Sequence, residues 1–472
     1  MRRALVFLLA FVFVATAVLA ACTNNNAGGG DTSAPPPAST DNGSATTDSG
    51  SGVVTGYQKD MQKDVITFKG VRPVTGANAI FEQVAFGPMY RMWAEQINDQ
   101  GGVYIKSLDR RVPVDIQVYD DGSDITKTTQ LFEQILASDK PDMVIPPEGT
   151  ASLFACAPIA QKYNYLLMCA EGGAVSLAQY LPEYKNTFLT LNCTEYCVNA
   201  LIKLFQEEGV KSVYLVYVDD LYGAEHRSIL EPGLKAAGID LLGMESIPLE
   251  GDFNPDNVVN NAMRSGCDAF CAFVYPPGFI PITMSAVKLD YNPNMFVVGS
   301  GGCFDVFGQM VFDDLTNKKV DGIITWGAWN EKSNQNGVRA KEFSDLFKNY
   351  YINRGEFWKN ADGSLNPNGF VFQDWFGHLP YYCIPQIWEQ ALGQAGELMD
   401  DGRINNQTLV DYIANNTFDT YMNPQLKFVN NVIPEDMYAG FLGQWQNGTF
   451  EVVDNDARRT ADPWYPKPAW QK

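Results

Sequence analysis

Histidine is nearly absent from this sequence: 472 residues contain only His226 and His378. Histidine is a frequent general acid or base near neutral pH and the commonest metal ligand, so the chain has little material for hydrolytic chemistry or a histidine-rich metal site. The patterns HExxH, GxSxG, GxGxxG and Walker A are missing as well. We therefore expect a protein that is not an enzyme and that holds no metal and no cofactor.

Positive charge is also scarce. The sequence has 34 Lys and Arg against 55 Asp and Glu, which gives a net charge of −21. Phosphate backbones and anionic headgroups attract surfaces rich in Lys and Arg, so we exclude nucleic acid as a partner and expect no adhesion of the folded body to anionic lipid. An acidic balance of this size is typical of a surface that keeps a protein soluble.

Cysteines at metal-ligand spacing are missing too. None of the nine cysteines forms a CxxC pair, which argues against a zinc ribbon or a thioredoxin-like site. Eight of them follow Cys22 in the chain: Cys156, Cys169, Cys193, Cys197, Cys267, Cys271, Cys303 and Cys383. Several lie within apolar runs, and the pattern is compatible both with buried free thiols and with one or two disulfides.

The strongest positive signal lies in the first 22 residues. Two arginines precede an unbroken apolar run, 4–18, and small residues then lead into Cys22. This order is typical of a secretory signal, which we place at residues 1–21. The alternative is a single transmembrane helix, but no positive cluster follows the run. The ending Leu19-Ala20-Ala21-Cys22 resembles a bacterial lipobox, in which the cysteine is acylated and becomes the mature N-terminus.

Residues 22–56 consist almost wholly of Asn, Gly, Ser, Thr, Asp, Ala and Pro. Such a segment has too little apolar surface to offset the entropy of ordering its backbone, so we expect a disordered tether. Together with a lipid on Cys22, the tether predicts an exported protein anchored at the outer face of the bacterial cytoplasmic membrane. The membrane is then a partner through the N-terminal lipid only.

From residue 65 onwards, short apolar runs alternate with amphipathic segments. We expect strands at 65–68, 114–118, 143–145, 165–169, 212–218, 241–247, 269–275, 295–299 and 320–326, separated by helices such as 78–100, 152–162, 223–237, 255–265 and 279–289. Later we expect helices at 370–394 and 406–415, a hairpin over 439–453 and a C-terminal strap. This alternation predicts an α/β fold with parallel sheets, and its restart near residue 191 predicts two lobes.

Several short motifs occur in a telling order. The first is Thr75-Gly76, which precedes a long expected helix ending at Gly101-Gly102, and the second is Val118-Tyr119-Asp120-Asp121 at the end of the next expected strand. A later strand is followed by Asp219-Asp220-Leu221-Tyr222-Gly223. Near the end of the chain comes Gly443-Gln444-Trp445-Gln446-Asn447-Gly448. In this order they resemble the type I periplasmic binding proteins, particularly the branched-chain amino acid and amide binders of ABC importers. The resemblance covers nearly the whole chain after residue 65.

The resemblance implies two Rossmann-like lobes with parallel central sheets, joined by a three-crossing hinge. The crossings fall near 189–193, 324–329 and 421–426. The N-terminal lobe then comprises 57–191 and 327–421, and the C-terminal lobe with the terminal strap comprises 192–326 and 422–472. A ligand is expected between the lobes.

The resemblance also implies which residues bind the ligand. Thr150, Ala151 and Ser152 occupy the loop that holds a ligand carboxylate in the family, and Glu171, Gly172 and Gly173 occupy a second such loop. Tyr222 and Tyr275 match cleft tyrosines, while Phe81 and Phe370 fall near the apolar side-chain pocket. Gly301 stands where amino-acid binders carry the acid that pairs with the ligand's ammonium. We interpret Trp326 and Trp329, at a predicted crossing, as packing residues.

Two departures from the family pattern bear on the ligand. Gly301 provides no counter-charge for an ammonium, and Glu171 would repel a ligand carboxylate. Either Glu171, Asp220 or Asp305 supplies the charge from elsewhere, or the ligand is not an α-amino acid. Amides, short polar organic molecules and cationic compounds therefore stay open beside amino acids.

The function that follows is a solute-binding lipoprotein that captures a small polar solute by hinge closure and delivers it to the permease subunits of an ABC importer. One alternative is a sensor on the same fold that signals to a partner. Another is a hydrolase with paired carboxylates such as Asp219 and Asp220, but adjacent side chains at a strand end point to opposite faces.

Overall fold

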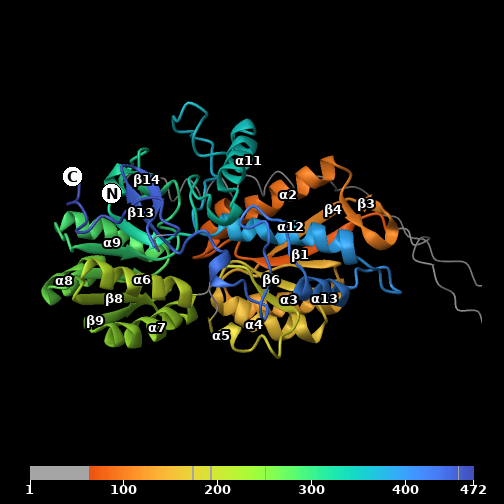
Figure 1. Cartoon of the computed structure of the whole chain (residues 1–472), viewed down its shortest axis with the longest axis horizontal. Coiled ribbons are helices and arrows are strands. Elements are labelled where there is room, and N and C mark those ends of the chain that lie inside the picture. The colour runs from red at the N-terminus through yellow and green to blue at the C-terminus, as the bar shows by residue number, and fades with distance from the viewer. Residues whose placement is uncertain (1–62, 173–174, 192–193, 250, 455–456, 472) are drawn as a thin grey trace, which may run out of the picture. The chain divides into compact units, whose positions relative to one another are not determined.

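The computed structural model describes residues 63–172, 175–191, 194–249, 251–454 and 457–471 (Figure 1). The predicted signal segment, the tether and Cys22 lie outside these residues, as do Gly173 and Cys193. Among the described residues, no helix is both long enough and apolar enough to cross a membrane.

The first lobe is built on short parallel strands. Strand β1 (Ile66–Arg72) lies between β4 (Val114–Asp120) and β5 (Met143–Ile145), and all three run parallel. Strands β6 (Leu167–Cys169) and β7 (Thr187–Leu189) form a second parallel pair, and β2 (Val103–Ile105) and β3 (Arg110–Val112) form an antiparallel one. The carboxyl ends of β1, β5 and β6 are where a ligand of an open α/β sheet binds.

Helices cover both faces of this lobe. They are η2 (a π-helix, Phe81–Phe86), α2 (Gly87–Asp99), α3 (Ile125–Gln134), α4 (Thr150–Lys162), α5 (Val175–Ala178), α12 (His378–Ala395) and α13 (Asn406–Asn415), with short η3 (Lys106–Leu108) and η4 (Ile135–Asp139). Helix α2 contacts α12, and α3 contacts α4. Figure 1 shows β1 between these two helix pairs.

The second lobe has one seven-stranded sheet in the order β14-β13-β12-β11-β10-β8-β9. The strands are β8 (Ser212–Val218), β9 (Asp240–Ile247), β10 (Ala269–Phe273), β11 (Met295–Val298), β12 (Ile323–Trp326), β13 (Leu442–Gln446) and β14 (Thr449–Val452). Strands β8 to β12 are parallel, and β13 and β14 extend the sheet as an antiparallel hairpin. Asn447 and Gly448 in its turn both have positive φ, as a tight hairpin turn requires.

The helices of this lobe are α6 (Thr194–Glu208), α7 (Leu221–Ala237), α8 (Pro255–Ser265), α9 (Pro276–Lys288) and α10 (Phe307–Phe312). Every residue of β10, β11 and β12 is buried, which accounts for the continuous apolar runs in the sequence. Two-lobed α/β architecture with parallel sheets, expected from the alternation, is therefore confirmed. The exact residue ranges of the two lobes stay a prediction.

Local capping explains several boundaries. Asp124 accepts hydrogen bonds from the backbone N–H groups of Thr126 and Lys127 and so begins α3, while Gly238 ends α7 in the left-handed conformation. The expected helix 370–394 is wrong in its first two turns, because α12 begins only at His378. Residues 371 and 374 instead form isolated β-bridges with Phe357 and Phe304, which hold this segment extended.

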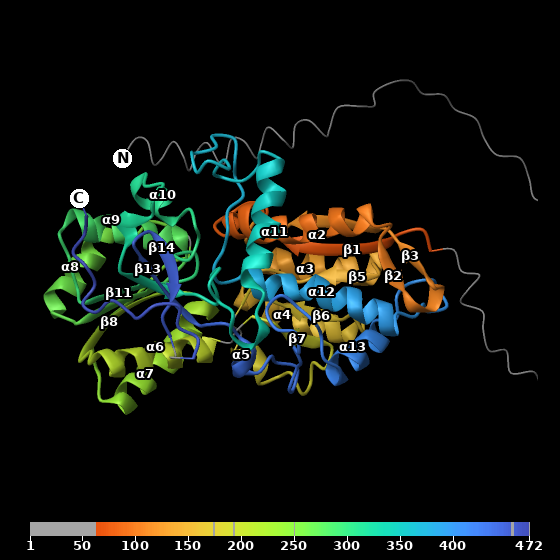
Figure 2. The same ribbon diagram turned by 45° about the horizontal axis from the view of Figure 1, so that its top comes forward.

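The segment that connects β12 to α12 in the chain contains α11 (Ala340–Asn353). Figure 2 shows α11 standing away from both sheets. Short turns η5 (Lys318–Val320), η6 (Gln335–Gly337) and η7 (Glu435–Met437) complete the described elements. The C-terminal residues lie along the second lobe, where the Trp470 indole N–H donates to the Tyr291 carbonyl and its ring packs edge-on against Phe296.

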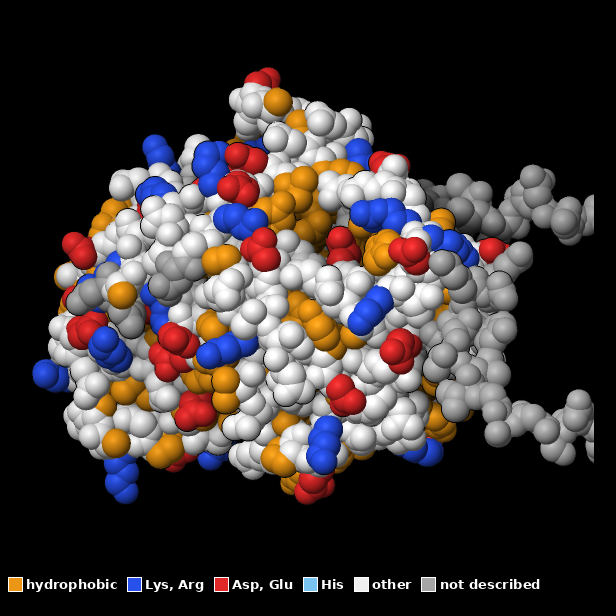
Figure 3. Space-filling model, turned by 45° about the vertical axis from the view of Figure 1, so that its right-hand side comes forward, with side chains coloured by type: hydrophobic (Ala, Val, Ile, Leu, Met, Phe, Trp, Pro, Cys, Tyr) orange, Lys and Arg blue, Asp and Glu red, His pale blue; other side chains and the backbone are white. Residues whose placement is uncertain are grey.

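The distribution of surface charge and the burial of the cysteines can be compared with what the sequence predicts. On the face in Figure 3, acidic and basic side chains are interspersed over the surface. The seven described cysteines after Cys22 are all buried, and six of them, Cys156, Cys169, Cys267, Cys271, Cys303 and Cys383, carry free thiols. Of the two possibilities left open above, the structure therefore supports buried thiols for these six.

Candidate functional site

A small pocket lies where the two lobes meet. Its cavity volume is about 50 Å³. On one side its walls come from η2, the β5–α4 loop with the start of α4, the turn after β6 and the segment before α12. On the other side they come from α6, α7, the β10–α9 turn, the turn after β11 and β12. Of the sequence-predicted residues, the pocket brings together Phe81, Thr150, Glu171, Gly172, Tyr222, Tyr275 and Gly301. Ala151, Ser152 and Phe370 are not part of its lining.

The omitted residues are explained by their places in the fold. Ala151 and Ser152 lie in the first turn of α4, immediately after Thr150. Phe370 lies in the segment after α11, where its backbone N–H donates to the Glu356 carbonyl. Gly173 lies outside the described residues. A ligand-binding role for each predicted residue stays a prediction.

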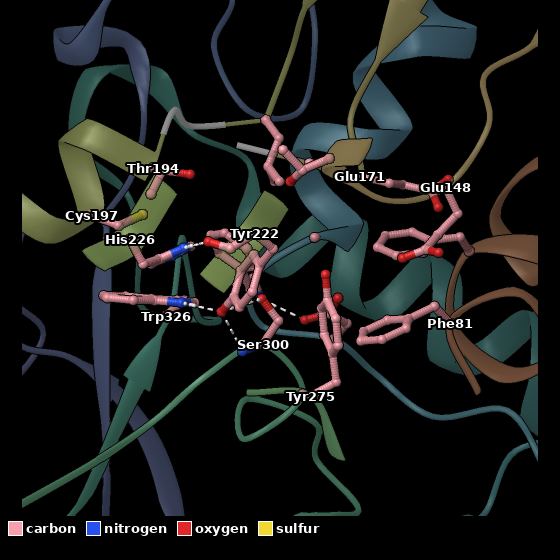
Figure 4. Close-up of a pocket in the computed structure, with 18 residues that line it drawn as sticks. Phe81, Glu148, Glu171, Thr194, Cys197, Tyr222, His226, Tyr275, Ser300 and Trp326 are labelled. Atoms are coloured by element: carbon pink, nitrogen blue, oxygen red, sulfur yellow. Dashed lines mark hydrogen bonds between the residues drawn. The ribbon is translucent and has the colours of Figure 1, made fainter. Parts of the chain in front are cut away.

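Tyr222 is positioned by the tight turn between β8 and α7. Asp220 caps α7 by accepting from the Gly223 N–H at 2.9 Å, and a Cβ on Gly223 would lie 1.9 Å from the Val218 carbonyl oxygen. The Tyr222 hydroxyl accepts from the Trp326 indole N–H at 2.9 Å (Figure 4). Burial raises the pKa of Tyr222 to about 12, so it stays a neutral hydrogen-bonding group.

Tyr275 extends the aromatic wall toward the other lobe. Its ring stacks on Tyr222 with centroids 4.9 Å apart, and its hydroxyl donates to Asp220 at 3.1 Å. Phe81 from η2 meets Tyr275 edge-on at 6.0 Å, so aromatic rings of the two lobes are in direct contact beside the pocket. Such pairs stabilise a closed arrangement beyond their buried area.

The first-lobe side of the pocket is dominated by charge. Arg72, at the end of β1, is completely buried, and its Nε and Nη2 donate to Glu82 and Glu171 at 2.6 and 2.5 Å. Its Nη1 donates to the Pro146 carbonyl at 2.7 Å. A buried guanidinium is tolerated when all of its edges are occupied in this way.

Glu148 and Glu171 both line the pocket and are both buried. Burial raises the pKa of Glu171 to about 8, against the opposing effect of Arg72. Burial also raises the pKa of Glu148 well above its usual range, and the nearby Glu171 adds to the effect. Glu148 accepts a hydrogen bond from Asn78 Nδ2 at 3.3 Å. This side of the pocket therefore holds more carboxylates than cations.

At two glycines in the lining the structure leaves no room for a side chain. A Cβ on Gly172 would lie 2.9 Å from the Thr150 nitrogen at the start of α4. Gly301 has φ of +100°, and a Cβ there would lie 2.7 Å from Pro276 Cγ. An acidic side chain at position 301 would force an unfavourable positive φ and would clash with Pro276. The backbone conformation of the turn after β11 therefore disfavours an acid at this position.

Sequence reasoning missed several lining residues. Trp326 was interpreted as packing, yet its indole both packs against His226 and holds the Tyr222 hydroxyl. Glu148 lies in the loop that follows β5, and Asp374 precedes α12, two positions that a periodicity argument does not single out. Arg72, which lies behind the pocket wall, was missed as well. Its position as a charged residue at the carboxyl end of an apolar strand could have indicated a role in the site.

The described part of the chain contains no group of three or more His, Cys, Asp or Glu side chains arranged to hold a metal ion. Figure 4 places Glu148, Glu171 and Phe81 on one side of the pocket and Cys197, His226 and Trp326 on the other. The pocket therefore has apolar, aromatic walls and carboxyl groups at one end. Such a pocket can hold a small solute by packing and hydrogen bonding.

Comparison with known proteins agrees with this fold. A family model described as periplasmic binding protein matches residues 70–360. The leucine-binding protein LivK of Thermotoga maritima superposes with a TM-score of 0.63 at 15% identity, over 83% of this chain and 99% of that one. The branched-chain amino acid binding protein LivJ of Streptococcus pneumoniae, solved with isoleucine, gives 0.63 at 14% identity over 86% and 100%.

A third solved structure carries a different ligand. The solute-binding protein of an ABC transporter from Rhodopseudomonas palustris, in complex with 3,4-dihydroxybenzoic acid, gives a TM-score of 0.62 at 14% identity. It covers 87% of this chain and 99% of that one. Likeness at these identities establishes the shared fold.

Proposed function

This chain belongs to the periplasmic binding protein family, and from that premise we propose that it is an extracytoplasmic solute-binding lipoprotein of an ABC importer. It captures a small polar solute between its lobes and presents the closed form to the permease subunits. It performs no chemistry on the solute.

One observation carries the proposal: the pocket is lined from both lobes, with Phe81 of one and Tyr275 of the other in ring contact beside it. A solute in this position contacts both lobes only when they are closed. Because it binds the closed form preferentially, it shifts the population toward that form.

A thermal-shift screen of the purified protein against amino acids, amides, amines and aromatic acids tests solute binding. A selective ligand raises the unfolding midpoint by mass action. Mass spectrometry of each ligand that binds then tests for chemistry: an unchanged ligand supports a binding protein, and turnover contradicts the proposal.

Glu225 provides a test of closure at a distance from the ligand. It lies on α7 of the second lobe and accepts from the backbone N–H groups of Val175 and Ser176 in the first lobe, at 3.1 and 2.7 Å. Glu225→Ala removes two charge-assisted bonds that require closed lobes, so we expect ligand affinity to fall about 10- to 100-fold by calorimetry.

Glu231→Ala is the matched control, because Glu231 lies on the same helix and forms an exposed pair with Arg227 at 3.5 Å. We expect that variant to bind as the parent does. Equal affinities of the Glu225 variant and the parent would show that the α5–α7 contact does not contribute to closure.

Anchoring by Cys22 is part of the proposal and has its own test. The parent chain expressed in bacteria should incorporate labelled palmitate and lose the first 21 residues. Cys22→Ser should do neither. A parent chain that keeps its leader and takes up no lipid would contradict the lipoprotein assignment.

A further inference from the structure

The pocket is lined by more acidic than basic side chains. Glu148, Glu171 and Asp374 line it, and among the described lining residues there is no lysine or arginine. Arg72, behind the wall, has its Nε, Nη1 and Nη2 occupied by Glu82, Pro146 and Glu171. The guanidinium can therefore offset only part of the charge of the carboxylates around it.

One carboxylate oxygen on this wall is poorly satisfied. Glu171 is buried and the Tyr381 hydroxyl lies near its carboxyl group, yet among the residues that the structure describes Oε1 accepts no hydrogen bond of good geometry. Leaving a buried acceptor unsatisfied is unfavourable, and a charged acceptor more so than a neutral one. A ligand with an N–H donor would satisfy it.

The other walls suit an apolar body next to a positive charge. Phe81, Tyr222 and Tyr275 present aromatic rings, and ring faces attract cations as well as burying hydrocarbon. His226 is neutral, because burial lowers its pKa to about 4. It therefore adds no positive charge at neutral pH.

A ligand carboxylate fits this pocket poorly. On the first-lobe side it would meet Glu148 and Glu171, where burial already raises the pKa of both carboxyl groups, and it would add a further desolvated negative charge with no lysine or arginine in the described lining to pair with it. At the opposite side, the geometry of Gly301 prevents an acid there from compensating a ligand ammonium. A free amino acid with its carboxylate at the first-lobe loops and its ammonium near Gly301 is thus disfavoured at both of its charged groups.

We infer that the pocket takes a small primary amine with an apolar or aromatic body and no carboxylate, with the ammonium held by Glu148 and Glu171. This inference rests on the proposed function and names the ligand class of the same pocket. The ammonium donates to Glu171 Oε1 and lies beside Glu148, and the hydrocarbon packs against the rings of Phe81, Tyr222 and Tyr275.

Three probes with one branched carbon skeleton test the inference by calorimetry on the purified protein. Leucine has both charged groups, isoamylamine lacks the carboxylate, and 4-methylpentanoate lacks the ammonium. We expect isoamylamine to bind at least about tenfold more tightly than leucine, and 4-methylpentanoate to bind most weakly.

Variants identify the carboxylates. Glu148→Gln and Glu171→Gln should each weaken isoamylamine binding about 10- to 100-fold, whereas Glu133→Gln, an exposed partner of Lys162, should leave it unchanged. If Glu171→Gln fails to fold, Glu148→Gln still tests the inference, because Glu148 has no ion pair with Arg72 among the described contacts.

The outcomes separate the ligand class from the proposed function. Leucine or 4-methylpentanoate binding more tightly than isoamylamine, no binding of isoamylamine, or unchanged binding in both glutamate variants each overturns the inference. If leucine binds and compacts the protein in solution scattering, the proposed function stands with an amino-acid ligand. If isoamylamine binds without compaction, the ligand class stands and lobe closure does not.

Discussion

Arg72→Met is expected to lower the free energy of unfolding by about 3–5 kcal/mol at pH 8, because it leaves buried carboxylates without their cation. Arg72 is completely buried between Glu82 and Glu171, so water cannot replace the lost partner. Methionine fills much of the same volume, which keeps the loss electrostatic. Urea unfolding of parent and variant measures the difference.

The loss should depend on pH in a defined direction. The pKa of Glu171 is already raised to about 8 in the folded protein, and removing Arg72 raises it further. A carboxyl with a raised folded pKa binds more protons folded than unfolded, so stability of the variant falls as pH rises between the unfolded pKa, about 4.3, and the folded one. Below about pH 8 the parent and the variant should therefore lose stability in parallel, and the deficit should widen as the pH rises above 8, where only the parent's Glu171 releases its proton.

Arg354→Met is the control for this experiment. Arg354 forms exposed ion pairs with Glu95 and Glu356, at 2.7 and 3.4 Å, and pairs of this kind contribute about 0–1 kcal/mol. A deficit for Arg72→Met no larger than that of the control, or one that does not change with pH, would contradict the assignment of Arg72 as the counter-ion of this wall.

The second large effect concerns the two histidines, both of which we expect to stay neutral down to about pH 5. Burial lowers the pKa of His226 to about 4 and that of His378 to about 3. Each imidazole makes a hydrogen bond that is compatible with its neutral form. His226 Nδ1 donates to the Tyr222 carbonyl at 2.7 Å, and His378 Nδ1 accepts from the Asp374 N–H at 3.2 Å.

A histidine with a lowered folded pKa takes up its proton more readily when unfolded. Stability is therefore lost as pH falls below the unfolded pKa of about 6.5, by about 1.4 kcal/mol per pH unit for each ring until the folded pKa is reached. The two rings together should remove about 3–6 kcal/mol between pH 6.5 and 4.

Nuclear magnetic resonance tests this directly, because the sequence supplies only two imidazole signals. Neither should shift between pH 8 and 5, and His226→Gln should flatten the acid limb of the stability curve. Either signal titrating near pH 6.5 in the folded protein would contradict the burial that the structure assigns to it.

Much of the fold was predictable because its signals are local. Apolar runs predicted β8 and β10, and the helix expected at 223–237 ends where Gly238 terminates α7. The start of α12 was not predictable from periodicity, because residues 371–374 are held by β-bridges to segments far away in the sequence. Tertiary pairing there overrides the local pattern.

The site was predictable in part for the same reason. Tyr222, Tyr275 and Glu171 follow strands, where an open α/β sheet places its ligand, and all three line the pocket. The link between Arg72 and Glu171 spans 99 residues of sequence and depends on how β1 and β6 meet in space. The repulsive effect of Glu171 could be foreseen, but its partial neutralisation by Arg72 could not.

Small-angle scattering with and without saturating ligand is the most direct test of the central claim, capture of a solute between closing lobes. The radius of gyration of the purified protein is expected to fall when isoamylamine, or whichever probe binds most tightly, is added. An unchanged radius under a ligand that calorimetry shows to be bound would contradict it.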